Sequence, residues 1–223
     1  MLTLYFHPLA SYCHKVLIAL YENGTPFEGQ IVDLLDEASK ADFQAIWPVG
    51  KMPILRDGAR TIPETSVIVE YLDRHHPGRA PLIPADPERA LDVRLWDRFF
   101  DLYVHTPMQK IVADRLRPEA QRDPLGVEQA RELLDTAYGL LERRLGDAWV
   151  AGPSFSLADC AAAPTLFYLQ AIHPYAPRHP RLAAYFERLY ARPSVRRAID
   201  EARPYLHMFP FVESLPARFR SKG

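Results

Sequence analysis

The segment from Leu2 to Gly24, LTLYFHPLASYCHKVLIALYENG, constrains the fold most, because its pattern changes from strand to helix across a short turn. Apolar and polar residues alternate from Leu2 to Phe6, which predicts a strand that ends before Pro8. An apolar stripe with helical spacing follows, made of Cys13, Val16, Leu17 and Leu20. Asn23-Gly24 predicts the end of this helix.

Ser11 stands at the expected start of the helix, where a hydroxyl has two possible roles. It can cap the helix by accepting a hydrogen bond from a backbone N–H. It can also act on a bound anion, because the free N–H groups and the dipole of a helix N-terminus favour negative charge. The spacing alone leaves both roles open.

The chain up to the helix after Thr65 alternates strands and helices in the order β-α-β-α-β-β-α, which predicts an α/β unit. The expected elements after the first helix are a strand at Phe27–Asp33, a helix at Ser39–Ile46, and strands at Met52–Leu55 and Arg60–Ile62. Pro53 interrupts the third strand and has no N–H to donate, so this strand belongs at an edge or a special turn. We predict a cis peptide bond between Met52 and Pro53.

The composition changes at the proline-rich stretch His76–Pro87, and the chain beyond it has helical patterns. Asp86-Pro87 predicts a helix start, and Ser156 with Asp159 predicts a capping box that opens an almost wholly apolar helix. Ser194 is expected to cap the last helix. We predict an N-terminal domain over residues 1–82, a linker over 83–88 and an all-helical domain over 89–223.

The composition excludes several classes of function. The 223 residues carry a formal net charge of −1, so no global positive field attracts nucleic acid. The two cysteines, Cys13 and Cys160, form no CxxC pair and no zinc spacing, and we expect no metal site. No apolar run reaches the ~18 residues of a membrane span, and the first residues do not resemble a signal peptide. We expect a cytoplasmic protein with no membrane partner.

Several motifs together resemble the cytosolic, bacterial-type glutathione transferase family over nearly the whole chain. They are SYCHKV after the first strand, GKMPIL before a hairpin, PETSVIVEYL, the proline-rich linker, and SLADC in the helical part. The resemblance implies an α/β thioredoxin-like N-terminal domain, an all-α C-terminal domain and a homodimer. Its interface is expected at the Tyr71 helix and near Leu91–Arg98. Glutathione would be the co-substrate.

The same resemblance implies which residues bind glutathione. The backbone of Met52, beside Pro53, would pair with the cysteinyl part of the tripeptide in the manner of strand addition. Glu64 would meet the γ-glutamyl ammonium group. Thr65, at the head of its helix, would bind the γ-glutamyl carboxylate through its N–H and its hydroxyl. Lys51 would reach the glycyl carboxylate.

The chain departs from the family pattern at the catalytic turn. Many relatives have the catalytic serine or cysteine at the position of Ala10, whereas the hydroxyl of this chain lies one residue later, at Ser11. We take Ser11 as the catalytic candidate, with Tyr5 and the main-chain donors of the turn as alternatives. Cys13 lies on the apolar stripe and is expected to be buried and inert. His14 is expected to be solvated.

The resemblance implies an enzyme that lowers the pKa of the glutathione thiol and presents the thiolate to a small hydrophobic electrophile, as in detoxification. The expected wall of the electrophile site is Tyr103, His105, Met108 and Ile111. A glutathione-dependent isomerase of the maleylacetoacetate isomerase type ranks second, because that group has a Ser-Ser-Cys turn and this chain has Ala-Ser-Tyr-Cys. A non-catalytic binding or regulatory protein, like the family member bound to RNA polymerase, remains an alternative.

Overall fold

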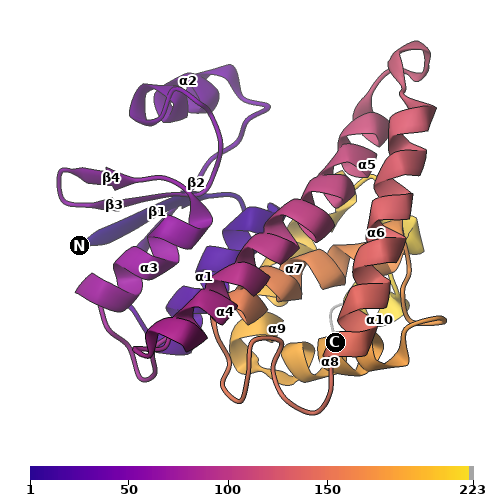
Figure 1. Ribbon diagram of the computed structural model, residues 1–223. Coiled ribbons are helices and arrows are strands. Elements are labelled where there is room, and N and C mark those ends of the chain that lie inside the picture. Colours follow the sequence, from indigo (N-terminus) through magenta and orange to yellow (C-terminus); the bar gives the residue numbers. More distant parts are fainter. Residues whose placement is uncertain (221–223) are drawn as a thin grey trace.

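The structure, a computed structural model, describes residues 1–220 of the chain. It has a small sheet with three helices at the N-terminal end and a larger helical part that follows (Figure 1). This arrangement confirms the predicted fold class, an α/β N-terminal domain followed by an all-α domain.

The sheet contains β1 (Leu2–Phe6), β2 (Glu28–Ile31), β3 (Ile54–Asp57) and β4 (Arg60–Ile62), in the spatial order β2-β1-β3-β4. Strand β1 pairs parallel with β2 and antiparallel with β3, and β3 pairs antiparallel with β4. The helices are α1 (Ser11–Asn23), α2 (Glu37–Ile46) and α3 (Thr65–His75). The predicted β-α-β-α-β-β-α order is therefore confirmed.

The alternation in β1 sets how the sheet is covered. Leu2, Leu4 and Phe6 are buried in the main core together with α1 and α3. Tyr5 lies on the other face, against a small cluster formed by Val32, Phe43 and Ile54. Because successive side chains of a strand point to opposite faces, one face carries the main core and the other faces α2. Helix α2 lies on the opposite side of the sheet from α3 in Figure 1.

The helical part begins with α4 (Pro87–Phe99), which continues through the π-helical segment Phe100–His105 into α5 (Thr106–Leu116). The later elements are α6 (Pro124–Arg144), α7 (Leu157–Ile172), α8 (Pro180–Ala191), α9 (Pro193–Ala202) and α10 (Ala217–Arg220), with 3-10 turns at Glu119–Gln121, Arg203–Met208 and Val212–Ser214. Helix α7 is buried along almost its whole length, as its apolar sequence predicts.

None of the helices in the described part of the chain is long and apolar enough to cross a membrane.

Two of the three helix starts predicted for the helical part are confirmed, whereas α2 begins at Glu37, two residues before the predicted Ser39. The carboxylate of Asp86 accepts the N–H of Arg89 at 2.9 Å, and Ser156 with Asp159 forms the capping box of α7. The prediction for Ser194 was wrong, because Pro193 occupies the first helical position of α9 and Arg192 is the N-cap residue. The hydroxyl of Ser194 donates to the carboxylate of Glu22 on α1 instead.

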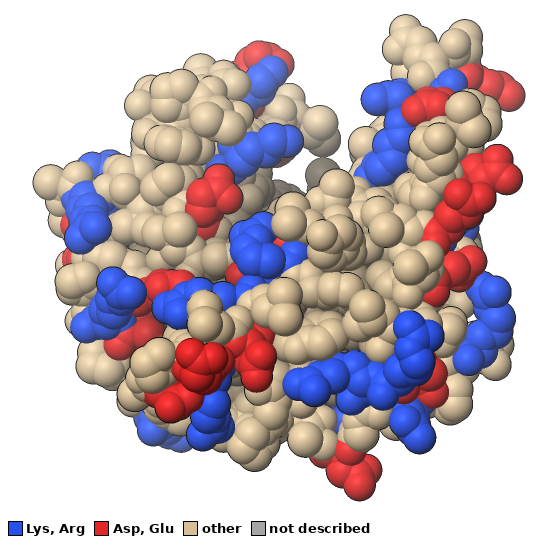
Figure 2. Space-filling model, viewed as in Figure 1, with Lys and Arg blue, Asp and Glu red and all other residues tan. Residues whose placement is uncertain are grey.

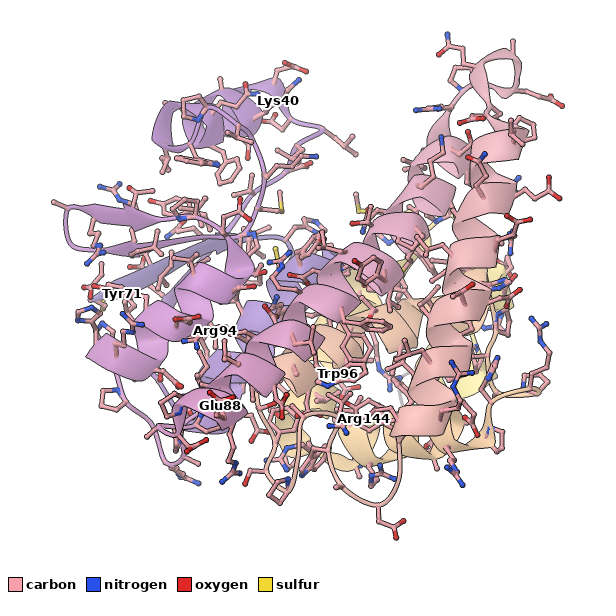
Figure 3. All side chains as sticks on the ribbon, in the orientation of Figure 1. Lys40, Tyr71, Glu88, Arg94, Trp96 and Arg144 are labelled. Atoms are coloured by element: carbon pink, nitrogen blue, oxygen red, sulfur yellow. The ribbon has the colours of Figure 1, made fainter. Side chains whose placement is uncertain are left out.

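Charged side chains join the two parts. The buried ammonium group of Lys15 on α1 lies 2.6 Å from Asp97 on α4 and 2.9 Å from Asp101 in the π-helical segment. Arg94 of α4 reaches Glu70 of α3 with Nε–Oε1 at 2.8 Å, and Figure 3 shows Arg94 on the side of α4 that faces α3. These contacts fix α4 against the N-terminal part and so fix the π-helical segment that follows it.

Candidate functional site

A cavity of about 770 Å³ lies between the two parts of the protein. Figure 2 shows the molecule hollowed between the lobe that carries α2 and the tips of α5 and α6. The N-terminal part lines the cavity with the turn after β1, the Gly50–Pro53 segment and the start of α3. The helical part lines it with α4, the π-helical segment, α5, the α7 residues Tyr168 and Ile172, and the 3-10 region near Phe209.

The turn after β1 is held by hydrogen bonds to three successive carbonyl groups. The carbonyl of His7 accepts from the N–H of Ala10 at 3.0 Å. The remaining two bonds come from more distant residues, from His14 Nε2 to the Pro8 carbonyl at 2.6 Å and from the Tyr168 hydroxyl to the Leu9 carbonyl at 2.6 Å. The turn therefore has little freedom to move when a ligand binds.

The prediction that His14 is solvated was wrong, because its ring is buried. The Pro8 carbonyl can only accept, so Nε2 of His14 carries a proton and donates. Burial lowers the pKa of His14 to about 4, which keeps the imidazole neutral at neutral pH. His14 therefore stabilises the turn through its hydrogen bond to the Pro8 carbonyl.

Ser11 is the first residue of α1, and the N-cap position belongs to Ala10, which has no side chain that can cap. The capping role is therefore excluded for Ser11 in this structure. Its side chain lines the cavity, and the N–H groups of Ser11 and Tyr12 form no hydrogen bond with any residue between 1 and 220. Unpaired N–H groups at a helix N-terminus are a binding site for an anion.

Two side chains from the helical part contact the Ser11 hydroxyl. Nε2 of His105 lies 2.7 Å from Oγ, and Nε2 of Gln109 donates to the same oxygen at 3.1 Å. Burial lowers the pKa of His105 to about 3, so its ring is neutral at neutral pH. Tyr12 stacks on this ring with centroids 3.6 Å apart. The π-helical segment ends at His105, and such segments occur often at functional sites.

Cys13 is buried as the sequence predicted. Burial raises the pKa of its thiol to about 12, so the sulfur is protonated and unreactive at neutral pH. Tyr5, the other alternative, packs on the opposite face of the sheet and is absent from the residues that line the cavity.

Lys51, Met52 and Pro53 line the cavity on the side of the N-terminal part, and the Met52–Pro53 peptide bond is cis, as predicted. The side chain of Lys51 is exposed. The backbone N–H and C=O of Met52 pair with no other backbone group in the described part of the chain. They are therefore free to pair with an extended ligand.

Glu64 and Thr65 line the cavity at the start of α3. Glu64 has φ 68°, a conformation that costs a non-glycine residue on the order of 1–3 kcal/mol. Strain of this kind is commonly found at ligand sites. The N–H and the hydroxyl of Thr65 form no hydrogen bond with any described residue, although only 8% of the residue surface is exposed. Thr65 thus offers two free donors to the cavity.

Two charged residues of the site, Arg98 and Asp101, were not predicted from the sequence. Asp101 is buried, and its Oδ2 lies 3.3 Å from Arg98 and 2.9 Å from Lys15. Its Oδ1 has no hydrogen-bond partner. Gln109 was not predicted from the sequence either. Asp101, His105 and Gln109 are spaced by four residues, so a polar stripe along this helix was the available signal.

The four residues expected to form the electrophile wall have different environments. Met108 lines the cavity, and His105 lies behind Ser11. Ile111 is 2% exposed and belongs to the core, whereas Tyr103 is 49% exposed outside the cavity lining. The face of α5 toward the cavity carries Met108, Val112 and Leu116, which follow one another at four-residue spacing. No cluster of three or more metal-ligating side chains occurs among residues 1–220.

The chain matches two family models, the glutathione S-transferase N-terminal domain over residues 4–80 and the glutathione S-transferase C-terminal domain over residues 124–188. A glutathione S-transferase of Pseudomonas putida is 33% identical over 160 residues, which are 71% of this chain and 70% of the relative. A stringent starvation protein A homologue of Haemophilus influenzae is 27% identical over 206 residues, which are 92% of each chain.

Among solved structures, the glutathione S-transferase of Methylobacillus flagellatus, with GSH bound, superposes with a TM-score of 0.81. It is 27% identical, and the alignment covers 89% of this chain and 98% of that one. The two family models match the two parts of the chain in the same order, and the superposition extends over 89% of the chain. The chain therefore belongs to the glutathione S-transferase family.

Proposed function

We propose that this protein binds glutathione in the cavity and activates its thiol for attack on a small hydrophobic electrophile, so that the alkyl or aryl group of the electrophile is transferred to the sulfur. The observation that carries the proposal is the Ser11 hydroxyl, which lies at the N-terminus of α1 beside the unpaired N–H groups of Ser11 and Tyr12. A cavity with this arrangement favours a bound thiolate over a thiol, because hydrogen bonds to the charged form stabilise it.

Free groups in the N-terminal part fit the tripeptide. The unpaired backbone of Met52 suits the extended cysteinyl residue, and the two free donors of Thr65 suit the γ-glutamyl carboxylate. Glu64 supplies the negative charge for the γ-glutamyl ammonium group, and Asp101 adds a buried carboxylate with one unpaired oxygen. Lys51 is the cation for the glycyl carboxylate.

Ser11 acts as a donor to the thiolate if its own proton is free. Gln109 already donates to Oγ, and His105 is neutral, so one of its two ring nitrogens carries a proton. We assign that proton to Nε2, so that both lone pairs of Oγ accept hydrogen bonds and the hydroxyl proton turns to the ligand. A free thiol has a pKa of about 8.5, and each donor to the anion lowers it.

Two other functions, an isomerase and a non-catalytic role, are alternatives to the transferase. An isomerase of the maleylacetoacetate type would need the same thiolate, but its dicarboxylate substrate also needs cations. The α5 wall of the cavity offers the uncharged side chains of Met108, Val112 and Leu116. A non-catalytic role is favoured by the stringent starvation protein A homologue among the relatives and by Ala10, which has no hydroxyl or thiol.

The test combines binding with turnover. The purified protein is expected to be retained on immobilised glutathione and to accelerate the reaction of glutathione with a general chromogenic electrophile. Retention without turnover of any electrophile in a broad panel would favour the non-catalytic role. Absence of both would refute the proposal.

A further inference from the structure

His7 is a polar side chain of the cavity that the proposed chemistry at Ser11 does not use. It lies at the end of β1, and the edge of the Tyr205 ring contacts its imidazole with centroids 4.9 Å apart. Its neighbours in the turn and in the facing wall include Leu9, Tyr168 and Phe209, which offer no free donor because the Tyr168 hydroxyl donates to the Leu9 carbonyl.

The backbone fixes which nitrogen of His7 carries the proton. The N–H of Leu9 donates to Nδ1 of His7 at 3.1 Å, so Nδ1 must present its lone pair. Since the neutral ring has one proton, that proton is on Nε2. The Leu9 N–H shares its peptide group with the Pro8 carbonyl, which accepts a hydrogen bond from His14 Nε2, so the N–H that sets the tautomer is itself held in place.

Nε2 of His7 forms no hydrogen bond with any group in residues 1–220. This nitrogen is also not buried, so a ligand can reach it. Burial lowers the pKa of His7, and the nearby carboxylate of Asp33 opposes this shift less strongly. At neutral pH the side chain is therefore an uncharged donor with a free N–H at the cavity.

We propose that His7 is a specificity-determining residue that selects electrophiles with a conjugated carbonyl, and that its Nε2–H donates a hydrogen bond to the carbonyl oxygen. This inference rests on the proposed transferase function. In the step, the thiolate sulfur forms a bond to the β-carbon of the enone, and the electron pair of the C=C bond moves so that negative charge develops on the carbonyl oxygen. Solvent then supplies a proton to the α-carbon.

A neutral imidazole suits this role. It stabilises the developing oxyanion without placing a full positive charge in an apolar wall, as the neutral histidine of triosephosphate isomerase does. The other polar side chains that face α1 are already committed, since Gln109 donates to Ser11 and the Thr106 hydroxyl donates to the Asp101 carbonyl. His7 is thus an uncharged side-chain donor that is available to the second substrate on this side of the cavity, and the Tyr12 hydroxyl on α1 is another.

The experiment compares two electrophiles that share a phenyl ring. One is 4-phenylbut-3-en-2-one, which develops charge on oxygen, and the other is benzyl chloride, which loses chloride and has no carbonyl. His7→Phe is expected to lower kcat/KM with the enone about ten- to a hundredfold and to change it less than about twofold with benzyl chloride. His7→Gln keeps an N–H donor and is expected to restore most of the enone activity.

His75→Phe, a substitution of an exposed histidine on α3, is the matched control and is expected to match the wild type with both probes. Equal losses with the two probes, or an unchanged enone rate in His7→Phe, would overturn the inference. So would a wild type that uses benzyl chloride but not the enone. A wild type that converts a chromogenic electrophile but neither probe would also overturn the inference, whereas absence of both glutathione retention and turnover of any electrophile would refute the transferase proposal itself.

Discussion

The hydroxyl of Ser11 lies 2.7 Å from Nε2 of His105, although the two residues are 94 positions apart in the sequence. The first belongs to the N-terminal part and the second to the π-helical segment of the helical part. The candidate catalytic group is therefore oriented by the other domain. Any change in how α4 packs on α1 and α3 is expected to alter the chemistry at Ser11.

Ser11→Ala is expected to raise the pKa of the bound glutathione thiol, because it removes a hydroxyl donor from the thiolate. A rise of about one unit lowers the thiolate fraction about tenfold at a pH below both values. The pH–rate profile with a chromogenic electrophile should move to higher pH. Residual activity should remain, because the N–H groups of Ser11 and Tyr12 are main-chain donors.

Cys13→Ser is the control for that experiment. Cys13 is fully buried in the core, so the new hydroxyl is expected to lower the free energy of unfolding while the activity of the folded protein is kept. If Cys13→Ser is folded and inactive while Ser11→Ala behaves as the wild type, the catalytic group is the cysteine and our assignment is incorrect.

Gln109→Leu tests the orientation of the hydroxyl. The variant removes one of the two donors to Oγ of Ser11, so the hydroxyl proton can turn away from the ligand. We expect kcat to fall several-fold with little change in the affinity for glutathione, and Gln109→Asn should not replace the longer side chain. Calorimetric titration and steady-state kinetics separate the two effects. An unchanged kcat in Gln109→Leu would refute the role of this residue.

Thr65→Val and Glu64→Ala are expected to weaken glutathione binding without unfolding the protein. Each substitution removes a hydrogen bond or an ion pair to a charged group of the tripeptide. The loss of such an interaction costs about 1.5–3 kcal/mol of binding free energy, which raises Kd roughly tenfold or more. Thr61→Val, at a half-buried position of the hairpin strand β4 outside the cavity lining, is a matched control. Calorimetric titration that finds the wild-type affinity in both variants would show that glutathione does not bind at α3.

His14 is expected to make the fold sensitive to acid. Its pKa is about 4 in the folded protein and about 6.5 in the unfolded chain, so between these values only the unfolded chain binds the proton. The contribution to stability is complete above about pH 6.5 and is lost as the pH falls towards 4.

The loss for one such histidine is on the order of 2 kcal/mol between pH 7 and pH 5. His105 acts in the same direction, whereas Asp159, whose pKa burial raises to about 6, acts in the opposite one. His14→Gln keeps a donor for the Pro8 carbonyl but does not titrate, so its urea midpoint should fall less between these pH values. An identical pH dependence in wild type and variant would contradict the assignment.

A homodimer is expected through α3 and α4, which present exposed apolar side chains. Val67, Leu91 and Leu95 are 54%, 58% and 60% exposed. The double variant Leu91→Asp/Leu95→Asp should be monomeric by light scattering, whereas Leu125→Asp, which changes a leucine 64% exposed at the start of α6, should remain dimeric. A monomeric wild type at micromolar concentration would refute this interface.

Local patterns were sufficient for much of the fold. The alternation from Leu2 to Phe6, the stripe on α1 and the capping box at Ser156 each depend on neighbours in the sequence, and the structure has all three. The local pattern gave the wrong cap at Ser194 and left the role of Ser11 open. In both cases the helix begins at a position set by its neighbours, Ala10 in one and Pro193 in the other, so the hydroxyl is already inside the first turn.

The sequence by itself determined the order of the elements, the cis proline segment and the residues of the N-terminal part that line the cavity. Those residues follow one another in short motifs, and the resemblance of these motifs to the family was enough to find them. Only the tertiary structure decided that His105 and Gln109 orient Ser11, that His7 is left with a free N–H, and that His14 is buried. These contacts depend on how α1 packs against the π-helical segment and α7, and burial, which sets the pKa of each histidine, is a property of the packed domains and not of the local sequence.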